Sequence, residues 1–204
     1  MKMQFNKRRL SFFAGIIVLA LVSCKKEKQP MATPDIPNTV MEYFDLNNQE
    51  IKAGAPGFSI DVDHDNRNDL AFSTQLVGDP INQVDKLQFL AGSNIKVNFA
   101  VNSNEAVPVM EAGDLIPLQN FDGYEWFELS SIVLVQKISS LTQPAFWEGH
   151  WKNASHRYLP YQVVKGDKLY NGWVELSVDT INEKLLLHRA AISKEAGKAV
   201  KAGN

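Results

Sequence analysis

Alternation of apolar and polar residues is the clearest pattern along the chain, and a period of two is typical of half-buried strands. Every second residue between 95 and 101 is apolar, and residues 173–179 repeat the pattern with Val174, Leu176 and Val178 predicted to face the core. Further strands are predicted at residues 57–62, 70–76, 87–91, 124–136, 158–164 and 184–192.

The predicted strands are short, and turn residues such as Gly166 separate them. No helical pattern of ten or more residues interrupts them after residue 40. These features predict an all-β fold, an antiparallel β-sandwich of the jelly-roll kind, over residues 41–192. The small, basic and polar tail at 193–204 is expected to fray, with a short helix as the alternative.

The N-terminal segment at residues 1–23 has a different composition. Four basic residues and no acidic residue accompany an apolar run of 13 residues at 10–22. As a helix this run is about 20 Å long, too short for a hydrocarbon core of ~30 Å. The segment therefore predicts a secretory signal peptide, with a buried core helix as the alternative.

The net charge of −2 is the sum of +4 on residues 1–23 and −6 on the rest. An acidic remainder argues against a nucleic-acid binder whose affinity rests on a basic surface. Cys24 is the single cysteine, which excludes an internal disulfide and a cysteine-based zinc site.

Residues 21–24, Leu-Val-Ser-Cys, resemble the lipobox of bacterial lipoproteins. The resemblance implies cleavage between Ser23 and Cys24, a diacylglycerol on the Cys24 sulfur and acylation of its new amine. The chemistry of an exported chain agrees, because a lone exposed thiol has no internal disulfide partner. Two or more acyl chains anchor a protein stably, so the expected partner is a membrane.

Residues 24–40 contain three prolines and little periodic hydrophobicity, which predicts an extended tether. The sixteen residues after Cys24, at ~3.1 Å each, could span roughly 50 Å. The Cys-Lys-Lys-Glu-Lys start is similar to lipoproteins of the Bacteroidetes group, which implies the cell envelope and, with Lys25 after the cysteine, the outer membrane. Surface-exported members carry an acidic run at this place, so the choice between surface and periplasmic face stays open.

The segments at 158–163 and 168–178 resemble the end of a family of secreted bacterial jelly-roll or concanavalin-like proteins of unknown function. An apolar strand at 185–191 and a closing Ala-Gly at 202–203 follow, as in that family. Pro160 and Glu175 depart from its usual glycine and arginine. The resemblance implies a sandwich fold and an exported location, and no reaction.

Four aspartates crowd one predicted loop. Asp61, Asp63, Asp65 and Asp69 stand where carboxylates bind Ca²⁺, and Arg67 stands where such loops offer a backbone carbonyl. The spacing is similar to the Asp-x-Asp-x-Asp-Gly-x-x-Asp loops of secreted repeat proteins. Any affinity is expected to be weak, near ~10⁻⁴ to 10⁻³ M.

Two substitutions qualify this calcium hypothesis. Asn66 replaces the usual glycine, and asparagine enters the left-handed region more readily than most residues. Phe72 stands where an EF-hand has glutamate, which argues against an EF-hand. The alternative is a polar turn whose aspartates bond to nearby backbone N–H groups.

A second candidate site is the aromatic segment around Trp147, Glu148, His150 and Trp151, followed by His156. Tryptophan offers a flat apolar face and a hydrogen-bonding edge, which suits carbohydrate, and the acid and histidines suggest a metal site. The spacing of the histidines matches no common zinc motif. The alternative is that the aromatic residues belong to the core.

The expected function is non-catalytic binding of a glycan or another envelope component, with calcium as a structural cofactor. One alternative is a glycan-active hydrolase, and the paired acids nominated for it are Glu125 with Glu128 and Glu175 with Asp179. The second pair would lie ~13 Å apart along a strand, beyond the ~5–9.5 Å that hydrolysis requires. A structural or assembly role in the envelope is the other alternative.

Overall fold

A computed structural model describes residues 39–204, which form strands joined by turns and loops. The predicted signal peptide, the Ser23–Cys24 bond and the tether up to residue 38 lie outside the described residues. No helix in the described part is long and apolar enough to cross a membrane. The strands are β1 (Met41–Lys52), β2 (Phe58–Ile60), β3 (Leu70–Asp79), β4 (Val84–Ser93), β5 (Val97–Val101), β6 (Leu115–Ile116), β7 (Glu125–Glu128), β8 (Ser131–Ser140), β9 (Phe146–Glu148), β10 (Arg157–Lys165), β11 (Lys168–Asp179), β12 (Lys184–Ser193) and β13 (Val200–Lys201).

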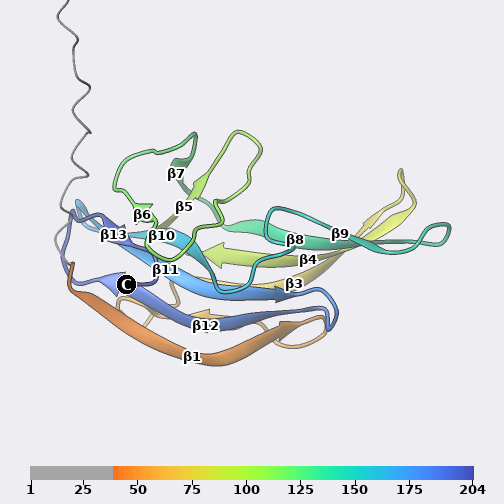
Figure 1. Ribbon diagram of the computed structural model, residues 1–204, viewed down its shortest axis with the longest axis horizontal. Helices are drawn as coiled ribbons and strands as arrows, with labels where there is room; N and C mark the ends of the chain where they lie inside the picture. The colour runs from red at the N-terminus through yellow and green to blue at the C-terminus, as the bar shows by residue number, and fades with distance from the viewer. Residues whose placement is uncertain (1–38) are drawn as a thin grey trace, which may run out of the picture. The chain divides into compact units, whose positions relative to one another are not determined.

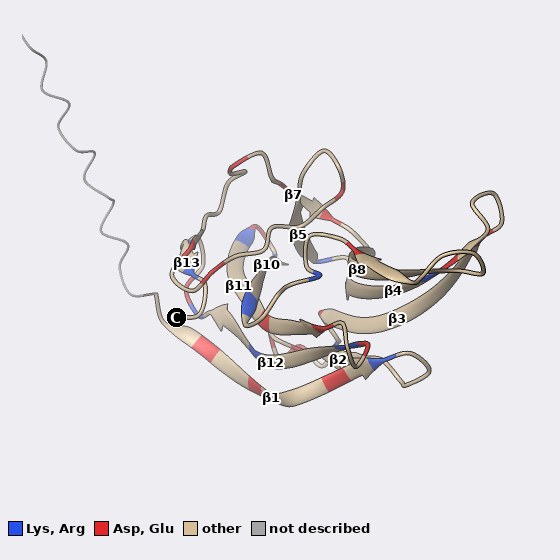
Figure 2. Ribbon diagram, turned by 45° about the vertical axis from the view of Figure 1, so that its right-hand side comes forward, with Lys and Arg blue, Asp and Glu red and all other residues tan. Residues whose placement is uncertain are grey.

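Two antiparallel sheets pack as a sandwich, which confirms the predicted fold class (Figure 1). One sheet has six strands in the order β1-β12-β11-β10-β5-β7, and the other has five in the order β2-β3-β4-β8-β9. Acidic residues recur along the edge strand β1 (Figure 2). The main core lies between the sheets and contains Val174 and Leu176, with Val178 packed against it, as the alternation predicted.

The outer face of the six-stranded sheet is covered by a second, smaller core. Trp173 and Tyr158 on this face pack with Ile116, Val200 and Ala202. The C-terminal tail therefore does not fray: β13 pairs with β6, and both Val200 and Ala202 are buried. The expectation of a frayed tail was wrong because its few apolar residues have a distant partner, which its polar composition does not reveal.

Two other differences from the predicted strands have local causes. The strand β1 was missed because its register shifts between Asp45 and Gln49, where Asn47 and Asn48 adopt φ values of 52° and 54°. This bulge interrupts the period of two that marks a strand in sequence. The single strand predicted at 124–136 is two strands, β7 and β8, which belong to different sheets.

Candidate functional site

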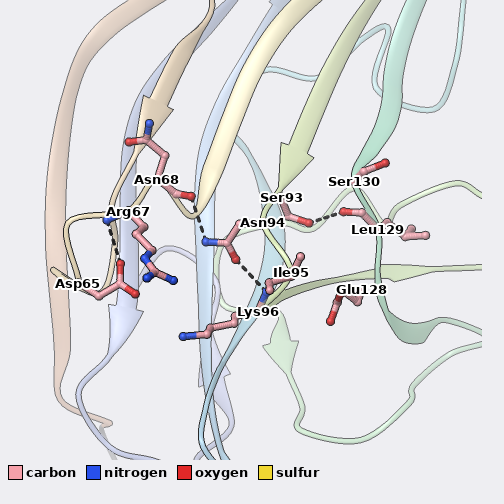
Figure 3. Close-up of a pocket in the computed structure, with 10 residues that line it drawn as sticks. All are labelled: Asp65, Arg67, Asn68, Ser93, Asn94, Ile95, Lys96, Glu128, Leu129 and Ser130. Atoms are coloured by element: carbon pink, nitrogen blue, oxygen red, sulfur yellow. Dashed lines mark hydrogen bonds between the residues drawn. The ribbon is translucent and has the colours of Figure 1, made fainter.

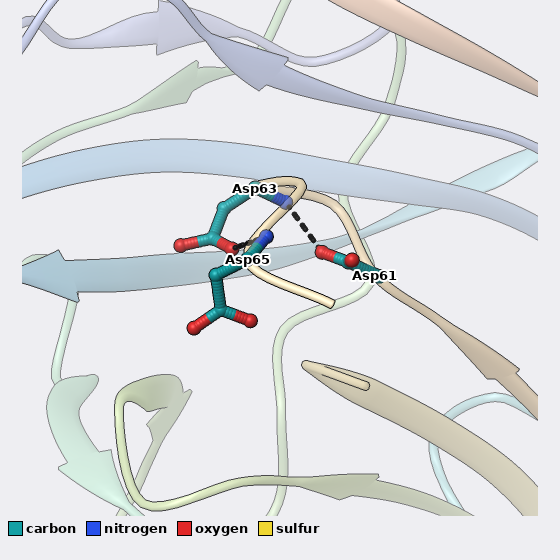
Figure 4. Close-up of side chains that lie close together, drawn as sticks. All are labelled: Asp61, Asp63 and Asp65. Carbon is teal, nitrogen blue, oxygen red and sulfur yellow. Dashed lines mark hydrogen bonds between the residues drawn. The ribbon is translucent and has the colours of Figure 1, made fainter. Parts of the chain in front are cut away.

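The aspartate loop connects β2 to β3, and it brings three of its four aspartates together (Figure 4). One carboxylate oxygen each from Asp61, Asp63 and Asp65 lies within 4.8 Å of the others. The Asp63 side chain is only 7% exposed and pairs with Lys165 at 3.3 Å. This partly exposed group could hold a metal ion.

The same aspartates make the turn bonds of the alternative interpretation. Asp61 accepts hydrogen bonds from the backbone N–H groups of Asp63 and Asn66, at 3.3 and 2.9 Å. Asp63 accepts from Asp65 at 3.1 Å, and Asp65 accepts from Arg67 at 2.9 Å. Asn66 has a φ of 64°, the left-handed conformation expected of it. Backbone bonds thus set the positions of the three carboxylates with no ion required.

Asp69, the fourth aspartate, lies outside this group and is buried. Its carboxylate accepts the Val62 N–H at 2.9 Å and the Asn94 side-chain amide at 3.0 Å. Burial, and then the nearby charges of Asp63 and Asp61, raise the pKa of Asp69, although the bonds to Val62 and Asn94 act in the opposite direction. The predicted set of four carboxylate ligands is therefore not assembled as one cluster.

The loop forms one wall of a hollow of about 320 Å³, called here the polar hollow after the charged and amide residues among those that line it (Figure 3). Arg67 and Asn68 line it from the loop, Lys96 from the turn before β5, and Ser130 from the turn before β8. Neither Arg67 nor Lys96 forms an ion pair with any described residue. The hollow therefore offers two cations with no carboxylate partner.

Two carboxylates also line the polar hollow, and their positions differ. Asp65 belongs to the three-aspartate group and accepts the Arg67 backbone N–H. Glu128 lies on the opposite side from Arg67 and Lys96 (Figure 3). The positive side chains therefore share one side of the hollow.

A larger groove of about 820 Å³, called here the apolar groove, borders the segment around Trp151. Its wall includes Glu148, His150 and Trp151, three of the four residues nominated from sequence, together with Phe127 of β7. Leu129 lines both this apolar groove and the polar hollow. The two depressions are therefore neighbours on the two sides of the segment that joins β7 to β8.

The tryptophans do not form an exposed platform and pack on the core, as the alternative interpretation predicted. Trp151 is 1% exposed in the main core, and Trp147 packs on Phe89 with ring centroids 5.8 Å apart. The exposed aromatic side chain in the groove is Phe127, which is 48% exposed. Sequence reasoning missed Phe127 because it was assigned to one long strand instead of to the edge strand β7.

The nominated acid and histidines do not form a metal site either. Among residues 39–204, the three aspartates are the one group of acids, histidines or cysteines close enough to share an ion. Glu148 instead accepts a hydrogen bond from the Gln136 side chain at 2.5 Å. His156 lies just before β10 of the six-stranded sheet, and its Nδ1 atom is 2.7 Å from Glu175.

A cluster around Glu175 went unnoticed in the sequence. The carboxylate of Glu175 also accepts Arg189 Nε at 2.5 Å, and His156 stacks on His188 at 4.2 Å. Burial alone would raise the pKa of Glu175, but the bonds from Arg189 and His156 outweigh it and hold that pKa below its usual range. This engagement removes Glu175 as a free catalytic acid. The pairing of β11 with β12 shifts register between Glu175 and Leu176, so that His188 is an extra residue in β12. The period of two is broken there, and alternation alone therefore did not predict the cluster.

Comparison of the chain with protein-family models, curated proteins and solved structures gave no match in any of the three sets. The jelly-roll family resemblance is therefore supported only at the level of the two-sheet sandwich.

Proposed function

We propose that the chain is a non-catalytic binding protein of a bacterial cell envelope, whose ligand is an acidic saccharide seated in the polar hollow and the apolar groove. The observation that carries the proposal is the pair of unpaired cations, Arg67 and Lys96, on one side of the polar hollow. An envelope glycan with a carboxylate group supplies the missing anion.

The donors of the polar hollow suit a sugar carboxylate. The guanidinium of Arg67 presents a fork that binds a carboxylate through two parallel hydrogen bonds, and the Lys96 ammonium adds a compact charge. Ser93 and Ser130 also line the hollow, with Ser130 beside Leu129 on the side away from Arg67 (Figure 3). The Ser93 hydroxyl donates to the backbone carbonyls of Val97 and Leu129, so it offers a sugar hydroxyl its acceptor lone pairs. The ligand therefore has its charged group beside Arg67 and its hydroxyls beside the serines.

The apolar groove suits the rest of the same ligand. Phe127 and Val133, which is 40% exposed, present apolar surface, and Asn104 and Gln136 present amides. A pyranose ring has an apolar face and a polar edge, so it needs both kinds of contact. Since Leu129 borders both depressions, an oligosaccharide of two or more residues reaches from one to the other.

Calcium is the metal that we propose for the three aspartates. Their ligands are hard oxygen atoms, which Ca²⁺ prefers. The ion would bind Asp61, Asp63 and Asp65, and would compensate the charge of Asp65 at the wall of the polar hollow. Its role is structural: it stiffens the loop that carries Arg67.

Attachment to the envelope is proposed on the sequence of the lipobox. Cys24 would carry the acyl chains after cleavage of the Ser23–Cys24 bond, and the outer membrane is the proposed location. Metabolic labelling with an alkyne fatty acid tests this. Label should enter the chain, and Cys24→Ala should prevent both labelling and cleavage; an acylated or cleaved variant would contradict the proposal.

The ligand class is tested with a glycan array probed by residues 25–204, which keep both hydrophobic cores. Saccharides with carboxylate groups should bind, and their neutral counterparts should not. Binding of neutral saccharides alone, or of none, would contradict the proposal. The groove also holds Glu105 and Glu148, so bound saccharides are checked for cleavage, which would favour the hydrolase alternative.

A further inference from the structure

The three most exposed large apolar side chains of the described residues all lie on hairpin connections. Ile81 is 91% exposed between β3 and β4, Leu141 is 104% exposed between β8 and β9, and Ile181 is 90% exposed between β11 and β12. Scattered apolar residues are ordinary on a protein surface. Three aliphatic residues on three projecting tips are a different arrangement and need an explanation.

Two of the turns share the pattern Asp-x-Ile-Asn and one conformation. Residues 79–83 read Asp-Pro-Ile-Asn-Gln, and residues 179–183 read Asp-Thr-Ile-Asn-Glu. In each, the aspartate accepts the asparagine backbone N–H and side-chain amide, at 3.1 and 2.8 Å in the first and 2.9 and 2.7 Å in the second. The fifth residue has a φ of 53° in one and 52° in the other. Each isoleucine therefore projects from a turn held by the same hydrogen bonds.

The three tips belong to one end of the molecule. Pairing of Val84 with Ser140 sets the β3–β4 turn beside the β8–β9 loop, and a hollow of about 530 Å³ lies between them. Lys137 of β8 pairs with Glu183 in the third turn at 2.5 Å. This turn lies at the far end of β1 from Met41, because Lys184 pairs with Lys52 (Figure 1).

Several charges beside the tips are paired within the protein, whereas the carboxylates of Asp85 and Asp179 have no ion-pair partner among the described residues. Asp79 pairs with Lys86 at 2.9 Å, Glu183 pairs with Lys137, and Lys184 pairs with Glu50. The tips therefore present aliphatic side chains without a cluster of unpaired cations. The tips are therefore suited to transfer of apolar groups out of water, and not to electrostatic attraction to an anionic surface.

We propose that Ile81, Leu141 and Ile181 insert into the interfacial region of a lipid bilayer. Separate projecting side chains need a soft apolar medium that closes around each one, whereas a protein partner needs a matching pocket for each. The tips can reach the bilayer that holds the proposed anchor, since a tether of roughly 50 Å exceeds the ~40 Å length of the 12-residue strand β1. The end of the sandwich opposite Met41 then faces the membrane.

Vesicle sedimentation tests this with residues 25–204, which lack the acylated cysteine. The protein should bind vesicles of phosphatidylcholine equally at about 0.1 M and about 0.5 M NaCl, since screening does not weaken apolar insertion. The triple variant Ile81→Ser, Leu141→Ser, Ile181→Ser should lower the partition coefficient at least about tenfold. These side chains are exposed, so the variant should keep the melting temperature of the parent.

Ile95→Ser is the matched control, because Ile95 is 75% exposed at the opposite end of β4. It should leave vesicle binding unchanged. Absence of binding by the parent protein, or equal binding by the triple variant, would overturn the proposal. A dimer seen by light scattering and lost in the triple variant would also overturn it, by assigning the tips to a second copy. The test is independent of saccharide binding.

Discussion

The loop at residues 61–69 and the segment at residues 146–151 are both dense in chemically versatile side chains, and the fold uses them in opposite ways. The loop bonds its aspartates to its own backbone and keeps Asp65 at the rim of the polar hollow. The segment sends Trp151 into the core, where its side chain also forms part of the groove wall, and leaves Glu148 and His150 exposed at the groove. Local hydrogen bonds therefore hold the aspartates of the first region in place, whereas packing against distant segments buries the main aromatic side chain of the second.

Gly149 explains how the second region turns inward. Strand β9 pairs with β8 over three residues only, and Gly149 then adopts a φ of 113°. A Cβ atom at this position would stand 2.9 Å from the Leu134 carbonyl oxygen. Glycine thus lets the chain pass close over β8, and Trp151 follows into the core.

Removal of the buried Trp151 indole is expected to have the largest effect and tests whether the second region is part of the core. Trp151→Ala should lower the free energy of unfolding by about 3–5 kcal/mol, because it leaves a large cavity in the main core. Trp151→Phe should cost much less, since the indole N–H has no hydrogen-bond partner among the described residues. Urea unfolding measures both. A stable Trp151→Ala variant would show that the segment is not a core element.

Calcium should act on the other region alone. With a dissociation constant near 1 mM, about 5 mM Ca²⁺ should stabilise the domain by about 1 kcal/mol, seen as a higher melting temperature. Asp65→Asn should abolish this shift while keeping the acceptor for the Arg67 N–H. Asp167→Asn, on the β10–β11 turn, is the control and should keep the shift. No shift in the parent protein would leave the turn bonds as the loop's only role.

The pKa of Asp69 measures how burial and the neighbouring carboxylates affect an acid of the loop. NMR titration should place its pKa above the ordinary 3.8, and Asp63→Asn should lower it only partly, because burial is the larger cause. Between 3.8 and the raised value the folded chain keeps a proton that the unfolded chain has lost. This group therefore makes the free energy of unfolding decrease as pH rises through that interval. An ordinary pKa for Asp69 would contradict the burial of its carboxylate.

Exposed cations should matter least to stability. The double variant Arg67→Gln, Lys96→Gln should change the free energy of unfolding by no more than about 0.5 kcal/mol, because neither side chain has an ion-pair partner. Thermal unfolding checks this. A large loss would mean that the two side chains support the fold, and that their place in the hollow is structural.

The sandwich was predictable where a strand keeps its period. Residues 173–179 alternate without interruption, so the inward-facing Val174 and Leu176 were identified correctly. The left-handed Asn66 was also predictable, because it stands at the glycine position of the loop and asparagine enters the left-handed region more readily than most residues. Both signals depend on neighbours in the sequence.

Features that join distant segments were not predictable. Val200 pairs with Ile116. Arg67 and Lys96 line one hollow only because the turns after β2 and β4 come together in the fold. His188 meets Asn48 because β1 and β12 carry irregularities at matching places. Nothing in the local pattern of any of these segments specifies its distant partner.

Titration calorimetry with one matched pair of ligands tests the central claim most directly. An oligosaccharide of uronic acids should bind residues 25–204, and its fully methyl-esterified counterpart should bind at least about tenfold more weakly, because it has lost the anion that Arg67 and Lys96 receive. The Arg67→Gln, Lys96→Gln variant should remove this preference while remaining folded. Equal binding of the acid and its ester, or an unchanged preference in the double variant, would contradict the assignment of the polar hollow.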